Sequence, residues 1–198
     1  MSPQNMRETL LARTVTVIAQ EGLDKTTTKA IVAGTGINEA YIYRLFSDKS
    51  DLLSKTFDLL DEELVGEAMK YVPVMYDSSV DVDLRFRKFF DGIWQFLLAG
   101  REKCLAFVRY YYSPYFSKYS AESHRQRNLP LVAEFSGVFR EEADVWMILN
   151  HILNVLLDFA VKVHYGQMSE SDDYVEHVFR VTYVSVKQYF KSTEEIQK

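Results

Sequence analysis

The chain has 198 residues, of which 47% are hydrophobic, and it carries a net charge of −5. This length and composition are sufficient for a buried core, which excludes an intrinsically disordered protein. The single cysteine, Cys104, excludes an intramolecular disulfide and a cysteine-rich zinc site. Gly and Pro are few and no repeat of fixed period is present, so we expect a largely helical fold.

Two segments bear on localisation. Charged residues interrupt the N-terminal apolar residues between positions 7 and 13, so this stretch lacks the form of a secretory signal. The most apolar later segment, 152–163, contains Asn154, Asp158 and Lys162. We expect it to fall short of the roughly 20 apolar residues that a membrane span requires. The sequence therefore predicts a soluble, cytoplasmic protein without membrane contact.

The net negative charge argues against nucleic acid binding, because affinity for a phosphate backbone comes largely from lysine and arginine. The charge is unevenly distributed, however. Basic residues slightly outnumber acidic ones in 1–56, and the acidity belongs to 57–198. DNA binding by the N-terminal part is therefore not excluded.

The first two helices are indicated by their start signals. Ser2 and Pro3 favour a helix start, and apolar residues then recur at helical spacing for about five turns. Either Thr26 or Thr27 is expected to cap a second, short helix. Gly34 and the glycine two positions later end that helix in a turn.

Asn38 is a suitable N-cap for a third helix, 39–46. Ile42 and Phe46 lie four residues apart on one face of that helix and are expected to anchor it in a core. Ser47 or Asp48 is expected to cap the helix that follows.

The remaining sequence predicts more helices. The segments with helical periodicity are 49–71, 84–97, 102–112, 142–165 and 172–192. Pro114 and Pro130 indicate an irregular polar region, which an apolar segment, 131–139, follows. The apolar stripe of 142–165 is too wide for one packing surface, so this helix needs apolar neighbours on two sides.

Helix, short turn and helix over residues 28–46 form a helix-turn-helix arrangement, whose second helix enters the DNA major groove. The segment 22–53 resembles the N-terminal domain of the TetR family of bacterial transcriptional regulators. The matching positions are Gly22, Thr26, Thr27, Ile31, Gly36, Ile37, Asn38, Ile42, Tyr43, Phe46, Lys49, Leu52 and Leu53. The sequence departs from the family pattern at Val32, Thr35 and Leu45.

The resemblance implies an all-α fold with a three-helix helix-turn-helix DNA-binding domain, 1–48. A long helix would join it to a helical effector-binding and dimerisation domain, 49–198. The implied function is that of a ligand-responsive repressor, which binds a pseudo-palindromic operator as a homodimer and is released by a small hydrophobic or aromatic effector. The alternatives are an interaction module without operator binding and, with the least support, an enzyme.

Candidate DNA contacts are the residues of the motif that its core does not require. They are Thr27, Lys29, Asn38, Glu39, Ala40, Tyr41, Tyr43, Arg44 and Lys49. Arg44 suits guanine or phosphate, Tyr43 suits phosphate, and Ala40 allows close approach or contact with a thymine methyl. The alternative is a solvated face for Arg44 and Lys29, with Tyr41 packed inside the small domain.

The family resemblance implies an effector pocket in the C-terminal domain. Its candidate lining residues are Phe86, Phe90, Trp94, Phe107, Tyr110, Tyr111, Phe139, Trp146 and Asn150. Asp158 is a further polar candidate. The alternative is that the aromatic residues are ordinary core, as stripes at helical spacing usually are.

The final two helices are expected to form a four-helix dimer interface with a symmetry-related copy. Leu149, Ile152, Leu156, Phe179, Val186 and Phe190 are expected to divide between the core and the partner. Periodicity alone does not say which residue goes where. The alternative is that 142–165 is the centre of a monomeric bundle.

Catalysis and metal binding have little support in the sequence. Cys104 and the four histidines, His124, His151, His164 and His177, include no pair with motif spacing, and no glycine-rich phosphate loop is present. His-x3-His and Cys-x2-Cys spacings are absent. We therefore expect no catalytic residues, no metal and no cofactor.

Overall fold

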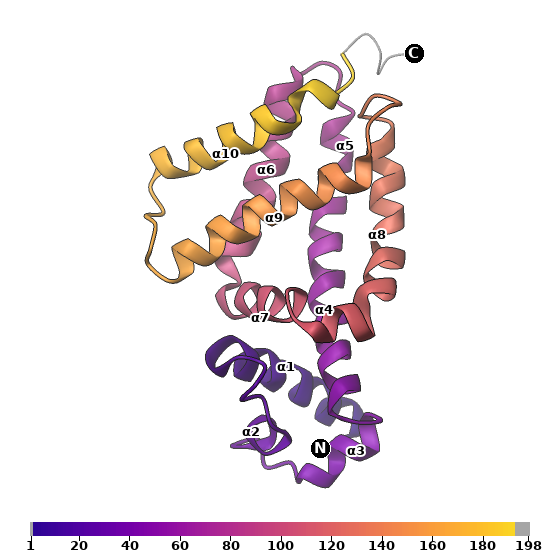
Figure 1. Cartoon of the computed structure of the whole chain (residues 1–198), viewed down its shortest axis with the longest axis vertical. Helices are drawn as coiled ribbons and strands as arrows, with labels where there is room; N and C mark the ends of the chain where they lie inside the picture. Colours follow the sequence, from indigo (N-terminus) through magenta and orange to yellow (C-terminus); the bar gives the residue numbers. More distant parts are fainter. Residues whose placement is uncertain (1, 193–198) are drawn as a thin grey trace. The chain divides into compact units, whose positions relative to one another are not determined.

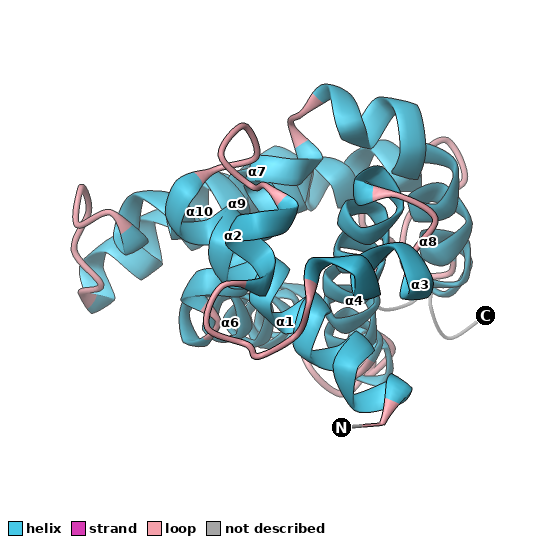
Figure 2. Cartoon of the chain, turned by 90° about the horizontal axis from the view of Figure 1, so that it is seen from below, coloured by secondary structure: helices cyan, strands magenta, loops and turns pink. Residues whose placement is uncertain are grey.

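The computed structural model describes residues 2–192, and Figure 1 shows the course of its helices. The α-helices are α1 (Pro3–Glu21), α2 (Thr28–Val32), α3 (Ile42–Leu45), α4 (Lys49–Met69), α5 (Val72–Met75), α6 (Val82–Ala99), α7 (Arg101–Tyr111), α8 (Ala121–Ser136), α9 (Val145–His164) and α10 (Asp172–Val186). Two short 3₁₀-helices, η1 (Glu39–Tyr41) and η3 (Lys187–Tyr189), and a π-helix, η2 (Phe116–Ser120), complete the list. Across residues 2–192 no strand is present beyond an isolated bridge between Phe139 and Phe190, which confirms the expected all-α fold (Figure 2).

The described chain divides into two compact units. The first holds residues 2–63 and 100–126, and the second holds residues 64–99 and 127–192. The first unit thus contains the helix-turn-helix together with most of α4, all of α7 and the start of α8. A domain boundary after residue 48 stays a prediction.

The helix-turn-helix is built on local caps and a small core. Ser2, Thr27 and Asn38 each accept a hydrogen bond from a main-chain N–H two or three residues later, as their side-chain chemistry predicts. The core residues are Leu10, Leu11, Ile31, Ile37, Ile42, Phe46 and Leu52. Because this core takes one face of each short helix, the opposite faces are left to solvent.

Helix α1 is bound to α7 within the first unit. The side chains of Thr16 and Gln20 donate hydrogen bonds to the Glu102 carboxylate, at 2.9 and 3.0 Å. Arg109 of α7 donates from Nη1 to the carbonyl oxygen of Ile18 at 2.7 Å. These contacts join segments more than 80 residues apart in the sequence. The helix-turn-helix core therefore shares a unit with α7.

In the second unit, α6 packs against α9 and α10. The rings of Phe86 and Phe90 of α6 contact Phe179 of α10, with centroid distances of 6.0 and 5.4 Å. Phe90 also stacks on Trp94, with their planes 8° apart. This aromatic stripe accounts for the helical spacing of the rings in α6 and forms the centre of the unit.

The expected irregular region around Pro114 and Pro130 is wrong. The chain is helical through η2 and α8, and Pro130 lies inside α8. Proline cannot donate to the carbonyl group four residues earlier, which normally interrupts a helix. Here Pro130 is exposed, so water can replace the lost hydrogen bond and the ring meets little protein.

Other helix boundaries differ by a few residues. Helix α4 ends at Met69, and Pro73 lies in the first turn of the short, unpredicted α5, where its missing N–H costs nothing. Helix α9 begins at Val145 because Asp144 caps it, and α10 ends at Val186, where η3 follows.

Helix α9 is long and apolar enough to cross a membrane by length and composition, so the expectation that this stretch falls short was wrong. The apolar residues on two sides of the helix outweigh the few charged ones. A third of its most apolar 18-residue window is buried inside the chain, and it packs against α6 and α10. The same test is also passed by core helices of water-soluble proteins, so α9 is weak evidence for a membrane span.

Candidate nucleic-acid interface

The second helix of the motif is formed by η1 followed directly by α3. The Asn38 carboxamide oxygen accepts a hydrogen bond from the main-chain N–H of Ala40 at 2.9 Å, which starts η1. Ile42 and Phe46 are buried and fix the helix to the core, as predicted. The opposite face of the helix is therefore free to meet a ligand as large as DNA.

The predicted DNA contacts lie on or beside this face. Thr27, Lys29, Asn38, Glu39, Ala40, Tyr43 and Arg44 are exposed, and Tyr41 and Lys49 are half-buried. Tyr43 has 59% of its surface exposed, which is unusual for so large a ring and leaves it available to a partner. The side-chain positions agree with a contact surface, and DNA contact by each residue stays a prediction.

Contacts inside the motif hold two of these side chains. The Thr28 hydroxyl donates a hydrogen bond to the Glu39 carboxylate, which connects the start of α2 to the start of η1. The Arg44 guanidinium lies over the Tyr41 ring, 5.1 Å from its centroid. Such contacts restrict the rotamers of Glu39 and Arg44, so less freedom is lost when they bind.

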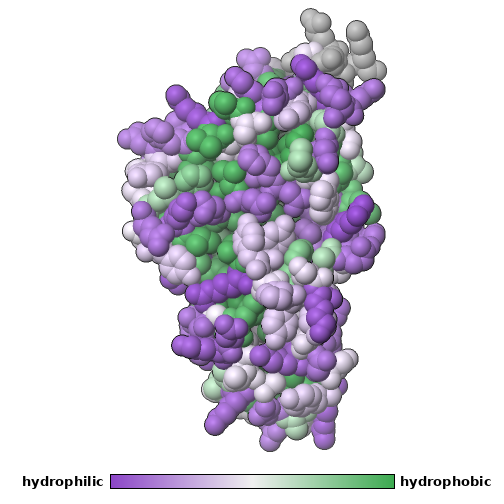
Figure 3. Space-filling model, viewed as in Figure 1, coloured by the Kyte–Doolittle hydropathy of each residue, from purple (hydrophilic) through white to green (hydrophobic). Residues whose placement is uncertain are grey.

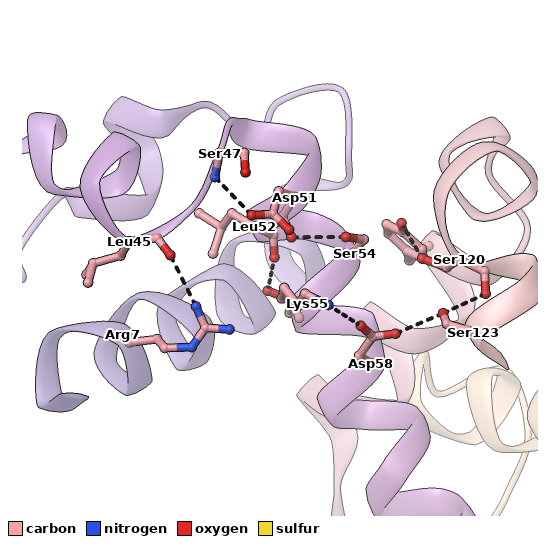
Figure 4. A network of polar contacts seen from close by, with 12 residues as sticks. Arg7, Leu45, Ser47, Asp51, Leu52, Ser54, Lys55, Asp58, Ser120 and Ser123 are labelled. Atoms are coloured by element: carbon pink, nitrogen blue, oxygen red, sulfur yellow. Dashed lines mark hydrogen bonds and ion pairs between the residues drawn. The ribbon is translucent and has the colours of Figure 1, made fainter. Parts of the chain in front are cut away.

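Arg7 supports the end of the recognition helix, and sequence reasoning missed it. Its Nη1 donates to the Leu45 carbonyl oxygen at 3.3 Å, as Figure 4 shows, and its guanidinium lies 4.6 Å from the centroid of the Phe46 ring. An arginine is a favourable partner for a helix C-terminus, whose last carbonyl groups lack helical donors. No local pattern around position 7 could have indicated a contact across 38 residues.

The start of α4 is fixed by a reciprocal cap. Asp48 accepts from the main-chain N–H of Asp51 at 2.8 Å, and the Asp51 carboxylate accepts from the N–H of Ser47 at 2.9 Å (Figure 4). This places Lys49 in the first turn of α4, immediately after the recognition helix. Lys49 is thereby held next to the surface that carries Tyr43 and Arg44.

The predicted pocket residues fall into two separate clusters. In the first unit, Phe107, Tyr110 and Tyr111 surround Phe57, with ring centroids 5.0, 4.9 and 6.5 Å away. In the second unit, Phe86, Phe90 and Trp94 line up along α6, and Phe139 stacks on Phe190. Trp146 and Asn150 are half-buried in α9, where the Asn150 amide donates to the Trp146 carbonyl oxygen at 2.8 Å. Asp158 is exposed and paired with Lys162.

The cluster of the first unit encloses buried polar groups. His124 Nδ1 lies 3.0 Å from both carboxylate oxygens of Asp61, and both residues are almost fully buried. The Tyr110 and Ser120 hydroxyls are hydrogen-bonded at 2.9 Å, and burial raises the pKa of Tyr110 to about 12. A polar pair inside an aromatic shell is the composition of a small-molecule site. Asp61 and His124 were not predicted, because their contact spans 63 residues.

The predicted dimer residues divide as follows. Ile152, Leu156, Val186 and Phe190 are buried inside the chain, and Leu149 and Phe179 are half-buried. Several large apolar side chains that were not predicted are instead exposed on the same two helices: Met147, Tyr174, Val181 and Val184. Figure 3 shows hydrophobic surface over α9 and α10. Partner contact is untested for all of these residues.

Cys104 is a poor nucleophile where the structure places it. Its thiol is buried in α7, and burial raises its pKa to about 12. A pKa above the ordinary value keeps the thiol protonated at neutral pH, whereas the thiolate is the reactive form. The geometry therefore offers no support for a cysteine-based reaction.

Comparison with known proteins identifies the N-terminal part. The model of the family described as bacterial regulatory proteins, tetR family, matches residues 10–56. The chain matches no curated protein.

Solved structures share the fold over nearly the whole chain. A TetR family transcription regulator from Marinobacter aquaeolei VT8 is 16% identical, with 92% of this chain and 95% of that chain covered and a TM-score of 0.72. A putative tetR family regulator from Shewanella sp. PV-4 is 15% identical, with 93% and 98% covered and a TM-score of 0.71. The fatty acid degradation regulator FadR from Bacillus halodurans is 18% identical, with 89% and 93% covered and a TM-score of 0.65. With its matching helix-turn-helix and this shared fold, the chain belongs to the TetR family of DNA-binding transcription regulators.

Proposed function

We propose that the protein is a cytoplasmic repressor, which binds a pseudo-palindromic operator as a homodimer and is released by a small hydrophobic or aromatic effector. The observation that carries this proposal is the exposed, polar and aromatic face of a recognition helix whose other face is anchored by Ile42 and Phe46. The protein would act by binding and not by catalysis. A gel-shift with the intergenic DNA beside its gene is the direct test, and specific retardation is the expected result.

The proposed DNA contacts have distinct roles. Arg44 and Ala40 lie where base edges would be read, and Tyr43 and Lys49 lie where phosphates would be bound. The Arg44 guanidinium presents parallel donors that match guanine, and its position over Tyr41 orients it. Thr27 is at the N-terminus of α2, where main-chain N–H groups favour a phosphate.

We expect Tyr43→Ala and Lys49→Ala to weaken binding to all DNA sequences, because phosphate contacts carry no sequence information. Arg44→Ala should in addition relax the preference at one base position, by about 1 to 3 kcal/mol of discrimination. Fluorescence anisotropy with the operator and with single-base variants measures both effects. Thr9→Ala on α1, outside the proposed surface, is the control. Unchanged affinity in all three variants would refute the contact assignment.

The proposed homodimer uses α9 and α10. Tyr174, Val181 and Val184 are exposed on α10 at spacings of seven and three residues, which places them on one face of the helix. Met147 is exposed on α9, and the two helices are joined by a hydrogen bond of 2.9 Å between His151 and Ser185. One helix-turn-helix reads few base pairs, so a second copy related by a two-fold axis supplies the other half-site.

The proposed effector site is the aromatic cluster of the first unit, around Phe57 and the buried Asp61–His124 pair. This cluster belongs to the same unit as the recognition helix, and α7 contributes to it while also holding α1 through Glu102 and Arg109. An effector that separates these rings would shift α7 and so disturb α1. Ligand and DNA would then compete through the conformation of one unit.

We expect any compound that stabilises the protein through this site to weaken operator binding, by a factor in the range of about 5 to 150. Linkage requires the operator to weaken binding of the compound by the same factor. Anisotropy titrations with and without compound, and calorimetry with and without operator, measure the two sides. Tyr112→Ala, on the exposed side of the same segment, should leave the coupling intact. A compound seen in the cluster by crystallography that leaves operator affinity unchanged would exclude this site.

A further inference from the structure

A second candidate binding site lies in the second unit, at Arg85 of α6. The Arg85 side chain has 0% of its surface exposed. Its Nη1 donates a hydrogen bond of 2.7 Å to the carbonyl oxygen of Met75, at the end of α5. Its Nε and Nη2 are shielded from solvent and have no hydrogen-bond partner among residues 2–192. The side chain is thus a buried cation with only one of its three nitrogens satisfied.

This arrangement is costly for the free protein. A guanidinium keeps its proton in proteins, so it cannot relieve burial by becoming neutral. A buried charge without a counter-charge is among the most unfavourable features of a folded chain. Arg87, two residues later, shows the ordinary solution, because it is half-exposed and paired with Asp91 and Glu176.

The neighbouring acids do not supply the missing partner. Asp77 and Asp83 are within electrostatic reach of this region, and both are exposed. The pKa of Asp77 is lowered mainly by hydrogen bonds from Ser79, and Arg85 contributes only a minor effect. Neither carboxylate contacts Nε or Nη2 of Arg85.

The two unsatisfied nitrogens define the chemistry of the missing group. Nε–H and one N–H of Nη2 project in parallel from the same edge of the planar guanidinium, and their spacing matches the two oxygens of a carboxylate. The hydrogen bond from Nη1 to Met75 holds the plane of the group from its other side. Arg85 is therefore preorganised to bind a carboxylate through two hydrogen bonds.

Aromatic rings provide an apolar wall nearby. Phe86 follows Arg85 in α6, and its ring lies 5.6 Å from those of both Tyr183 and Phe190. The pKa of Tyr183 is raised by burial first and by Asp83 second, and Arg85 opposes the shift, so the phenol lies in the field of the guanidinium. An acid bound at Arg85 would meet rings and not water.

We propose that Arg85 is the anchor of a binding site for a small organic carboxylate with an aromatic or aliphatic body. The site is distinct from the Phe57 cluster, and binding there does not require that the protein bind DNA. Access would follow opening of the pairing between residues 138–140 and 189–191, which Arg140 and Lys191 close through main-chain hydrogen bonds of 2.9 and 3.0 Å.

Benzoate and its neutral isostere benzamide are suitable probes. Millimolar benzoate should raise the midpoint of thermal unfolding of the wild type, and benzamide should not. Arg85→Met should weaken benzoate binding, measured by calorimetry, by about tenfold or more, since two charge-assisted hydrogen bonds are lost. Arg87→Met removes a charge from the same helix and should retain wild-type affinity. Equal effects of benzoate and benzamide on the wild type, or unchanged affinity in Arg85→Met, would overturn the proposal.

Two additional measurements cover a variant that fails to fold and an acid from the chain itself. In ¹⁵N-labelled wild type, the Arg85 Nε–H resonance, assigned with Arg85→Lys, should shift on addition of benzoate and not of benzamide. Glu194 and Glu195 lie outside the described residues, so a chain ending at Ser192 is the control for them. Both chains should bind benzoate equally. Binding by the shortened chain alone would mean that the chain's own carboxylate occupies Arg85, and it would refute the proposed ligand.

Discussion

Val181→Glu should yield a folded monomer whose operator affinity is lower by about a hundredfold or more. Val181 is 58% exposed on α10, so glutamate meets no packed neighbour within the chain and folding is unaffected. In the proposed dimer the same side chain is buried against the partner, where unpaired carboxylates are strongly unfavourable. Two linked heads bind more tightly than one by about 10² to 10⁴. Sedimentation, circular dichroism and operator anisotropy measure assembly, folding and binding.

A matched control is available on α6. Leu84 is 54% exposed, so Leu84→Glu introduces the same charge on a similarly exposed aliphatic residue that is not part of α9 or α10. It should remain dimeric and bind the operator normally. Val186→Glu provides the opposite contrast, because Val186 is buried inside the chain and its charged variant should unfold. A Val181→Glu protein that remains dimeric would move the interface away from this face of α10.

The division between predictable and unpredictable features follows sequence separation. The caps at Ser2, Thr27 and Asn38 were predictable because each bonds to a main-chain group within three residues. The burial of Ile42 and Phe46 was predictable because helical period alone places them on one face. The exposed face of the recognition helix followed from those two inferences.

Features that depend on distant contacts were not predictable. The chain gives no local indication that Asp61 meets His124, or that Arg7 meets the end of α3. Wide apolar stripes have the same limitation. Periodicity placed Leu156 and Val186 on apolar faces, but only the packing of α9 and α10 within the chain shows that both are buried there.

Pro130 illustrates a different failure. Proline is a helix breaker on average because it loses a hydrogen bond and its ring clashes with the preceding turn. The energetic cost depends on whether water can reach the freed carbonyl group, and that is a property of the folded surface. Its exposure in α8 was therefore the deciding fact, and the sequence around it carries no sign of that exposure.

Ile42→Ala should abolish operator binding and leave the dimer intact, which is the reverse of the result expected for Val181→Glu. Ile42 is 0% exposed in the small core of the helix-turn-helix, and removal of a buried isoleucine side chain costs about 2 to 5 kcal/mol. A core of so few residues cannot absorb that loss, so η1 and α3 should detach from α1. Ile42→Val, which costs only about 0.5 to 1.5 kcal/mol, should keep most of the affinity.

Limited proteolysis distinguishes this outcome from a lost DNA contact. In Ile42→Ala, cleavage should concentrate between α2 and α4, while sedimentation still shows a dimer. Tyr43→Ala, at the neighbouring exposed position, should weaken DNA binding with no new cleavage, because it removes a contact and leaves the core unchanged. Normal operator affinity in Ile42→Ala would show that the recognition helix does not depend on this anchor, and the assignment of opposite buried and DNA-facing sides to that helix would have to be abandoned.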